Sequence, residues 1–184
     1  GGTERVIWDL GKALAALGHR VSYLVPAGSS CDFGAVIPIR PGMAWREQIP
    51  ADVDLVHFQF NPGFGDDFDR PFLVTQHGNS VESIALPRNT VFVSANHAGR
   101  HGSSQFVYNG MDWSAYGPVD FNRPRRYFHF LGKAAWRVKN VQGAIDVARA
   151  AGVELMVMGG TRINFKRGFR WTWSRRVQFA GMVG

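Results

Sequence analysis

The sequence predicts an α/β protein made of parallel β-sheets and divided into two units. Short apolar runs recur along the chain without the polar alternation of strands that face water. Such runs are typical of strands that are covered on both faces of a parallel sheet. The charge also changes, from a net −4 in residues 1–120 to a net +11 in residues 121–184. Because Pro118 and Pro124 flank this change, we predict two units, 1–119 and 120–184.

The first predicted element is a helix near the start of the sequence. Val6, Leu10, Leu14 and Leu17 recur at steps of three and four residues, which places them on one helix face. Gly18 follows the last of them, and a glycine at this position typically ends a helix. We therefore predict a helix with one apolar face that ends at Gly18.

The remaining predicted elements are strands and one further helix. Residues 141–151 predict a helix that ends at Gly152, because Val141, Ile145 and Ala148 share one face. Apolar runs bounded by turn residues predict strands at 21–25, 35–39, 55–59, 72–76, 90–95, 106–109, 127–132, 153–158 and 177–181.

Composition limits the class of protein. The 184 residues are 45% hydrophobic, as in a globular protein, and no apolar run approaches the roughly 18 residues of a membrane span. The single cysteine, Cys31, excludes an internal disulfide and fits a reducing compartment. We expect a cytoplasmic protein. A peripheral association with the inner face of the membrane is compatible with this location.

Ligands of open parallel sheets bind beyond the carboxyl ends of the strands, which selects a small set of residues. Each has an ordinary explanation when taken alone: a histidine in a loop is usually solvated, and a glycine pair is usually a turn. The selected residues are His77, Ser94, Asn96, Asn109, Gly110, Lys133, Gly159 and Gly160.

Taken in order, several motifs carry a family resemblance. They are "GGTERV", "FLVTQHG", "VYNGMDWSAYGP", "FLGKAAWRVKN", "ELMVMGG" and "FAGMVG". This series resembles the retaining glycosyltransferases of family 4, over essentially the whole chain. The resemblance implies the GT-B fold, in which two Rossmann-like domains face each other across a cleft. It places the acceptor mainly on residues 1–119 and a nucleotide sugar on residues 120–184.

The resemblance implies roles in the first domain. Gly1 and Gly2 would form a phosphate-facing loop before the first helix. His77 would be the catalytic residue, lying over the transferred sugar near the reacting carbon. Asn109, in the "NGMD" motif, is counted with the residues that bind the donor.

In the second domain the resemblance implies a grip on the donor diphosphate. Lys133 stands where the family usually has Arg, and Lys139 stands at the family's Lys; Arg137 would assist this pair. Gly159 and Gly160 would let the nucleotide approach the sheet. The Arg-to-Lys change keeps the charge at residue 133 but loses the two-pronged geometry of a guanidinium.

The implied chemistry needs no cofactor and no metal. Breaking the anomeric C–O bond of a UDP- or GDP-sugar places negative charge on the departing phosphate, and fixed cations stabilise that charge. The substrates would be the nucleotide sugar and a glycan, lipid or small-molecule acceptor. The expected outcome is transfer to a hydroxyl with retention of configuration.

The chain departs from the family pattern at both ends. The strand expected before "GGTERV" is absent, and so is the pair of glutamates expected after Gly184. We therefore expect a chain cut at both ends, which would need a complementing chain or a second copy and which could be inactive alone.

Other interpretations of the sequence stay open. A sugar-nucleotide epimerase would share the fold. Asp67 and Asp69 have the spacing of a metal-binding Asp-x-Asp motif but favour a solvated loop, and Asp146 and Glu154 are poor candidates for paired catalytic carboxylates. The basic and aromatic segment 164–176 favours a loop whose tryptophans pack on the domain; a membrane-facing role ranks second and nucleic-acid binding last.

Overall fold

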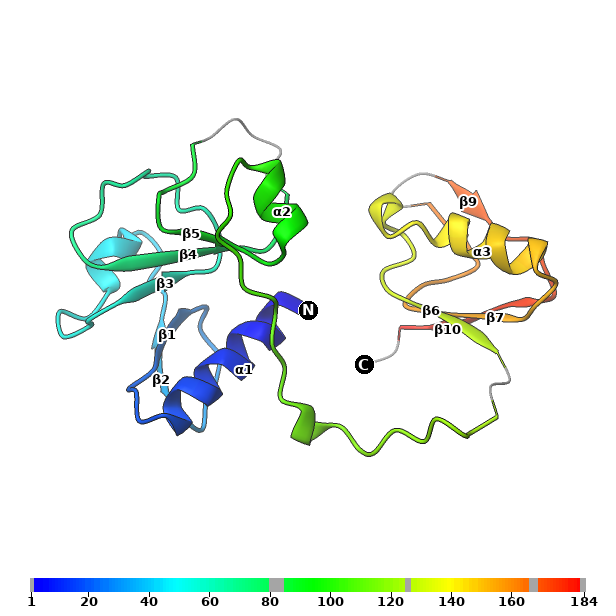
Figure 1. Ribbon diagram of the computed structural model, residues 1–184, viewed down its shortest axis with the longest axis horizontal. Helices are drawn as coiled ribbons and strands as arrows, with labels where there is room; N and C mark the ends of the chain where they lie inside the picture. Colours follow the sequence, from blue (N-terminus) through cyan, green and yellow to red (C-terminus); the bar gives the residue numbers. More distant parts are fainter. Residues whose placement is uncertain (1, 80–84, 125–126, 166–168, 183–184) are drawn as a thin grey trace. The chain divides into compact units, whose positions relative to one another are not determined.

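The computed structural model describes residues 2–79, 85–124, 127–165 and 169–182. The chain divides into two compact units, Gly1–Gly117 and Pro118–Gly184 (Figure 1). Each unit combines helices with parallel strands, which confirms the predicted α/β class with parallel sheets. The assignment of the units to an acceptor side and a donor side stays a prediction.

Two parallel sheets lie in the described residues of the first unit. β1 (Ser22–Val25) pairs with β2 (Ala35–Pro38), and a second sheet has the order β3 (Val56–Phe58), β4 (Phe72–Gln76), β5 (Thr90–Phe92). Successive residues of β4 alternate between buried and half-buried, as expected of a strand that is covered on both faces.

Aromatic rings form the core beside the second sheet. Phe58, Phe72 and Val74 are buried, and Trp45, Phe64 and Phe68 pack against them. Trp45 comes from the short 3₁₀ helix η1 (Trp45–Gln48), and its ring stacks on Phe64 with centroids 5.8 Å apart. This cluster packs along β3 and β4 and so anchors the strands from which the loops carrying Gln59 and His77 continue.

The described part of the first unit also contains two α-helices and a second 3₁₀ helix. They are α1 (Gly2–Ala16), α2 (Ala95–Arg100) and η2 (Trp113–Ala115). Ser94 accepts a hydrogen bond from the backbone N–H of His97 and so caps α2. The strand predicted over 90–95 ends at Phe92 for this reason. The strand predicted over 106–109 is reduced to one bridge between Phe106 and Phe92.

The packed face of helix α1 only partly matches the predicted apolar face. Gly11 is its buried residue, and a methyl group there would overlap the Tyr23 hydroxyl, so the ring of Tyr23 lies across the helix at this point. The contact face therefore centres on Gly11. Of the predicted apolar face, Val6 and Leu14 are half-buried, whereas Leu10 and Leu17 are exposed.

The second unit is built on a three-stranded parallel sheet with the order β10–β7–β6. β6 (Phe128–Leu131) leads through η3 (Arg137–Lys139) and α3 (Val141–Ala150) to β7 (Leu155–Met158). β10 (Val177–Gly181) then pairs with β7 from the other side. Asn140, with a left-handed φ of 53°, caps α3 by accepting from the backbone N–H of Gly143.

The core of the second unit lies between α3 and the sheet. Ile145 and Val157 are fully buried there, and Val141, Ala148 and Val177 surround them. An antiparallel hairpin, which the sequence did not predict, connects β7 to β10. Its strands are β8 (Ile163–Asn164) and β9 (Arg170–Trp171).

None of the helices in the described part of the chain has the length and apolarity that a bilayer-crossing segment requires.

Candidate functional site

A pocket of about 440 Å³ lies at the carboxyl ends of β6 and β7 in the second unit. It brings together three residues that the sequence selected, Lys133, Gly159 and Gly160. The remaining described residues that line it are Ala135, Trp136, Thr161, Asn164, Arg170 and Met182. The pocket is therefore the candidate ligand site of this unit.

Backbone hydrogen bonds draw the loops after β6 and β7 together. The N–H of Ala134 donates to the Gly159 carbonyl at 3.0 Å, and the N–H of Gly159 donates to the Gly181 carbonyl at 2.6 Å. A Cβ on Gly159 would overlap the carbonyl oxygen of Gly132, and a Cβ on Gly160 would lie 2.6 Å from that of Ala134. With a φ of 107°, Gly159 also holds a conformation that other residues rarely adopt. Loop packing thus requires both glycines.

Two cations are among the described residues that line the pocket. Lys133 Nζ lies 4.9 Å from the centre of the Trp136 ring, a cation–π distance. Arg170 donates to the Thr161 carbonyl at 3.0 Å and to Thr172 Oγ1 at 2.9 Å, and its guanidinium lies over Phe179. Burial lowers the pKa of Arg170. Because no carboxylate is among the described lining residues, the pocket has a net positive charge that suits an anion.

Arg170 was missed by the sequence analysis. Its position depends on the register of the β8–β9 hairpin, in which Arg170 pairs with Asn164. Side chains of directly paired residues share a face of the hairpin, and both of these line the pocket. A strand signal of two residues is too short to be found from periodicity.

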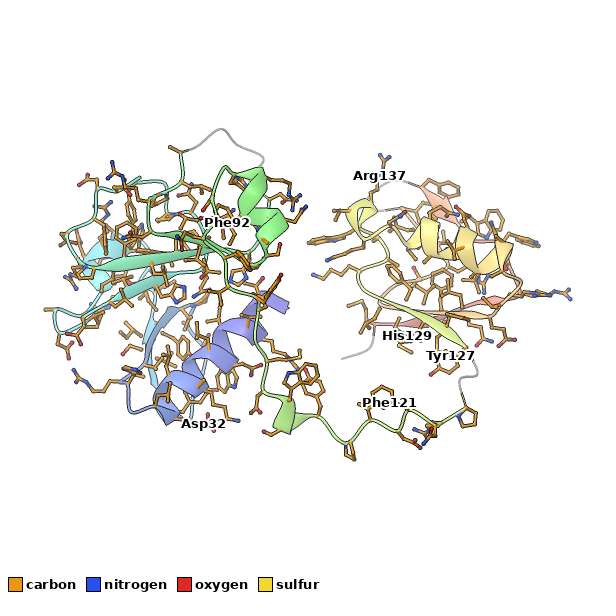
Figure 2. All side chains as sticks on the ribbon, in the orientation of Figure 1. Asp32, Phe92, Phe121, Tyr127, His129 and Arg137 are labelled. Carbon is orange, nitrogen blue, oxygen red and sulfur yellow. The ribbon has the colours of Figure 1, made fainter. Side chains whose placement is uncertain are left out.

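The other two cations of the predicted diphosphate grip lie outside the pocket. Arg137 and Lys139 belong to η3 and are exposed, and neither is among the pocket-lining residues. Figure 2 shows Arg137 pointing away from the sheet of its unit. The described structure therefore brings Lys133 together with the glycine pair, but not with Arg137 or Lys139.

His77 follows β4 in the first unit, at the carboxyl end of that strand. Its Nε2 lies 2.9 Å from Gln59 Oε1, which follows β3 in the same way. Partial burial lowers the pKa of His77, which favours the neutral form of its ring. The neighbouring His57 is also half-buried, and its Nε2 lies 2.8 Å from Thr75 Oγ1.

Near His77, two buried polar atoms have no hydrogen-bond partner among the residues that the structure describes. They are Oε1 of Gln76, which precedes His77, and Nε2 of His97, whose side chain is 3% exposed. Gln76 Nε2 donates to the Gly78 carbonyl at 2.9 Å, which ties the loop that carries His77 back to the end of β4. Unsatisfied buried groups concentrate at functional sites and strained loops.

The remaining predicted residues have less defined surroundings. Gly2 is the first residue of α1, so it belongs to the helix and not to a loop before it. Gly1 lies outside the described residues. Asn109 is exposed in the irregular segment before η2. Asp67 and Asp69 lie in a loop, and among the described residues no group of three His, Cys, Asp or Glu side chains is placed to hold a metal ion.

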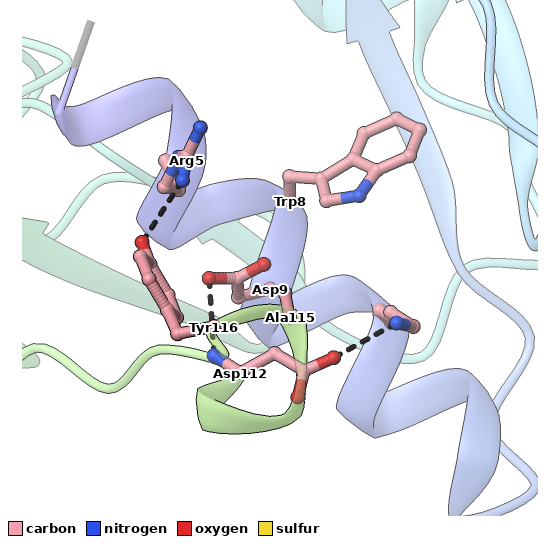
Figure 3. A pocket seen from close by; sticks show the side chains of 7 residues that line it. Arg5, Trp8, Asp9, Asp112, Ala115 and Tyr116 are labelled. Carbon is pink, nitrogen blue, oxygen red and sulfur yellow. Dashed lines mark hydrogen bonds and ion pairs between the residues drawn. The ribbon is translucent and has the colours of Figure 1, made fainter. Parts of the chain in front are cut away.

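A second pocket, of about 350 Å³, lies between α1 and η2 in the first unit (Figure 3). Its charged side chains bond to one another or to nearby polar groups: Lys12 Nζ lies 2.8 Å from Asp112 Oδ2, and Asp9 Oδ2 accepts from the N–H of Asp112. Arg5 also donates to the Tyr116 hydroxyl at 2.9 Å. Hydrogen bonds from Lys12 and Ser114 lower the pKa of Asp112 to about 2. These contacts hold residues 112–116 on the helix.

Comparison with protein-family models and with curated proteins found no match for this chain.

Proposed function

We propose that this chain is a glycosyltransferase of GT-B type that moves a sugar from a nucleoside diphosphate sugar to a hydroxyl acceptor with retention of configuration, without a metal. The observation that carries the proposal is the cationic pocket at the carboxyl ends of β6 and β7. Three residues selected from sequence, Lys133, Gly159 and Gly160, line this one pocket. Its position follows the rule for ligands of parallel sheets.

The diphosphate would bind against the cations of this pocket. Lys133 would contact the phosphates as a point charge, and Arg170 adds a second cation whose position is fixed by its bonds to Thr161 and Thr172. Because Arg170 is held before any ligand arrives, it stabilises charge on the leaving phosphate without reorganisation. Lys139 and Arg137 would join this grip only if η3 moves toward the ligand.

His77 would act on the sugar and not on the diphosphate. A neutral ring, held by Gln59, can accept or donate a hydrogen bond to a sugar hydroxyl without repelling the cation-like transition state. This role assigns binding of the leaving group to the second unit and orientation of the reacting carbon to the first.

Calorimetric titration of the full chain with UDP, GDP and ADP tests the donor site. We expect one of them to bind, and Lys133→Ala to weaken its binding about ten- to a hundredfold, the effect of losing a charge-assisted hydrogen bond. Arg123→Ala is the matched control, because Arg123 is exposed in the same unit and does not line the pocket. An equal loss in both variants, or no binding of any nucleotide, would refute the assignment.

A separate measurement addresses the reaction. Incubation with the sugar nucleotide whose base binds, followed by product analysis, distinguishes transfer with retention from hydrolysis and from an epimerised sugar nucleotide. A product of inverted configuration or an epimer would contradict the proposed reaction while leaving the nucleotide site intact.

A further inference from the structure

The β8–β9 hairpin has two faces of different chemistry. Asn164 pairs with Arg170 on the face that lines the pocket, and Ile163 pairs with Trp171 on the opposite face. Thr172 is 3% exposed, whereas its neighbours Trp171 and Trp173 are 57% and 80% exposed. The alternation that directs Arg170 and Thr172 inward therefore directs both tryptophans outward.

The outward face collects large apolar side chains, and we name it the hairpin face. Phe165 and Phe169 adjoin the two strands and are each more than half exposed, with ring centroids 5.6 Å apart. The residues of the hairpin face are Ile163, Phe165, Phe169, Trp171 and Trp173. The expectation that the tryptophans pack on the domain is wrong, because hairpin register turns them to solvent. A solvent-facing cluster of this kind marks an interaction surface.

The unit around the hairpin face carries a large uncompensated positive charge. Residues 121–184 have 13 Lys or Arg and 2 Asp or Glu. Among the described residues of this unit, the single ion pair joins Arg149 to Asp146 at 3.9 Å. Arg149 also donates to the Trp173 carbonyl at 3.0 Å, which holds a cation beside the hairpin face. Arg175, two residues after Trp173, is exposed.

We propose that the hairpin face docks the second unit onto an anionic lipid surface. Tryptophan and phenylalanine side chains partition to the boundary between lipid headgroups and acyl chains, and adjacent arginines are attracted to acidic headgroups. The exposed rings thus provide the apolar contact, and the net positive charge provides the selectivity for anionic lipid. The inference does not depend on the chemistry of the neighbouring pocket.

Two other occupants fit the hairpin face less well. A single-stranded nucleic acid needs open ring faces interleaved with free cations. The Trp171 and Trp173 rings instead pack against each other edge to face, with an interplanar angle of 75°. Arg162 and Arg170 bond to protein oxygens on the inner side of the hairpin. A second copy of the unit would carry the same positive charge and be repelled.

Sedimentation of the full chain with vesicles tests the docking. We expect binding to phosphatidylcholine mixed with phosphatidylglycerol, weak binding to phosphatidylcholine alone, and release by salt. Trp171→Ala combined with Trp173→Ala should weaken binding about tenfold or more. Trp113→Ala is the control, since Trp113 is 73% exposed in the first unit. Arg175→Ala should weaken binding about fivefold, whereas Arg20→Ala should not.

Brominated lipids provide a first readout on the unmodified chain, which does not depend on whether a variant folds. Tryptophan emission of the unmodified chain should be quenched by brominated anionic vesicles, and the double variant should lose that quenching. Docking on lipid would be refuted if the chain did not sediment with the vesicles, or if Trp113→Ala weakened vesicle binding as much as the double variant. Oligonucleotide binding with the same dependence on Trp171 and Trp173 would also refute it. So would a doubled mass in light scattering that the double variant abolishes.

Discussion

Gly159→Ala tests whether the pocket is built on contact between the two loop backbones. The substitution places a methyl group at a φ of 107° and into the space occupied by the Gly132 carbonyl oxygen. The unfavourable conformation costs about 1–2 kcal/mol, and displacing packed backbone costs about 1–3 kcal/mol more. The sum, about 2–5 kcal/mol, is comparable with the whole stability of a unit of this size, at roughly 0.05–0.15 kcal/mol per residue.

Gly152→Ala separates the two contributions. Gly152 also has a positive φ, of 67°, but its nearest neighbour there is the end of the Arg176 side chain, which can move. We expect this variant to lose only the conformational part, about 1–2 kcal/mol. Urea unfolding followed by circular dichroism measures both variants, and nucleotide titration then reports whether the pocket survives. Equal destabilisation by the two substitutions would refute the backbone-contact argument.

Three further predictions concern the first unit. His77→Ala should lower sugar transfer far more than nucleotide binding, measured by turnover and calorimetry, whereas His19→Ala should change neither. Burial lowers the pKa of His57, His77 and His97 below 6.5, so the neutral forms of these rings stabilise the fold fully above about pH 6.5. This stabilisation should be lost as the pH falls, which unfolding titrations from neutral to acidic pH would show. His57→Gln should make the fold less sensitive to that fall in pH. Asp112→Asn should release residues 112–116 from α1, measured as faster amide exchange at Ser114. Asp120→Asn is the control and should leave that exchange rate unchanged. An unaltered exchange rate in Asp112→Asn would show that Lys12 does not hold the segment.

The sequence predicts elements well where several buried residues share one period. The helix over 141–151 and the strand at 72–76 satisfy this condition, and the structure has α3 at Val141–Ala150 and β4 at Phe72–Gln76. The face of α1 was predicted only in part, because its tightest contact is made by Gly11, a residue without a side chain, under a tyrosine from β1. Helix α2 was missed because its cap, Ser94, follows a strand directly and was included in the apolar run.

The residues of the candidate site also fall into those that the sequence predicts and those that it does not. Lys133 and the pair Gly159 and Gly160 follow long apolar runs, so the strand-end rule selected them, and they line one pocket. Arg137 and Lys139 were selected by resemblance alone, and their 3₁₀ helix directs them elsewhere. Arg170 and the hairpin face depend on the pairing register of a very short hairpin, which only three-dimensional structure reveals.

The hairpin register limits how this segment can vary over evolution. Substitutions can change the pocket side and the outer side of the ribbon independently, because alternate residues belong to different sides. Inserting or deleting one residue beside Arg170 would exchange the sides, turning an arginine outward and a tryptophan toward the pocket. Changes in hairpin length should therefore occur in steps of two residues.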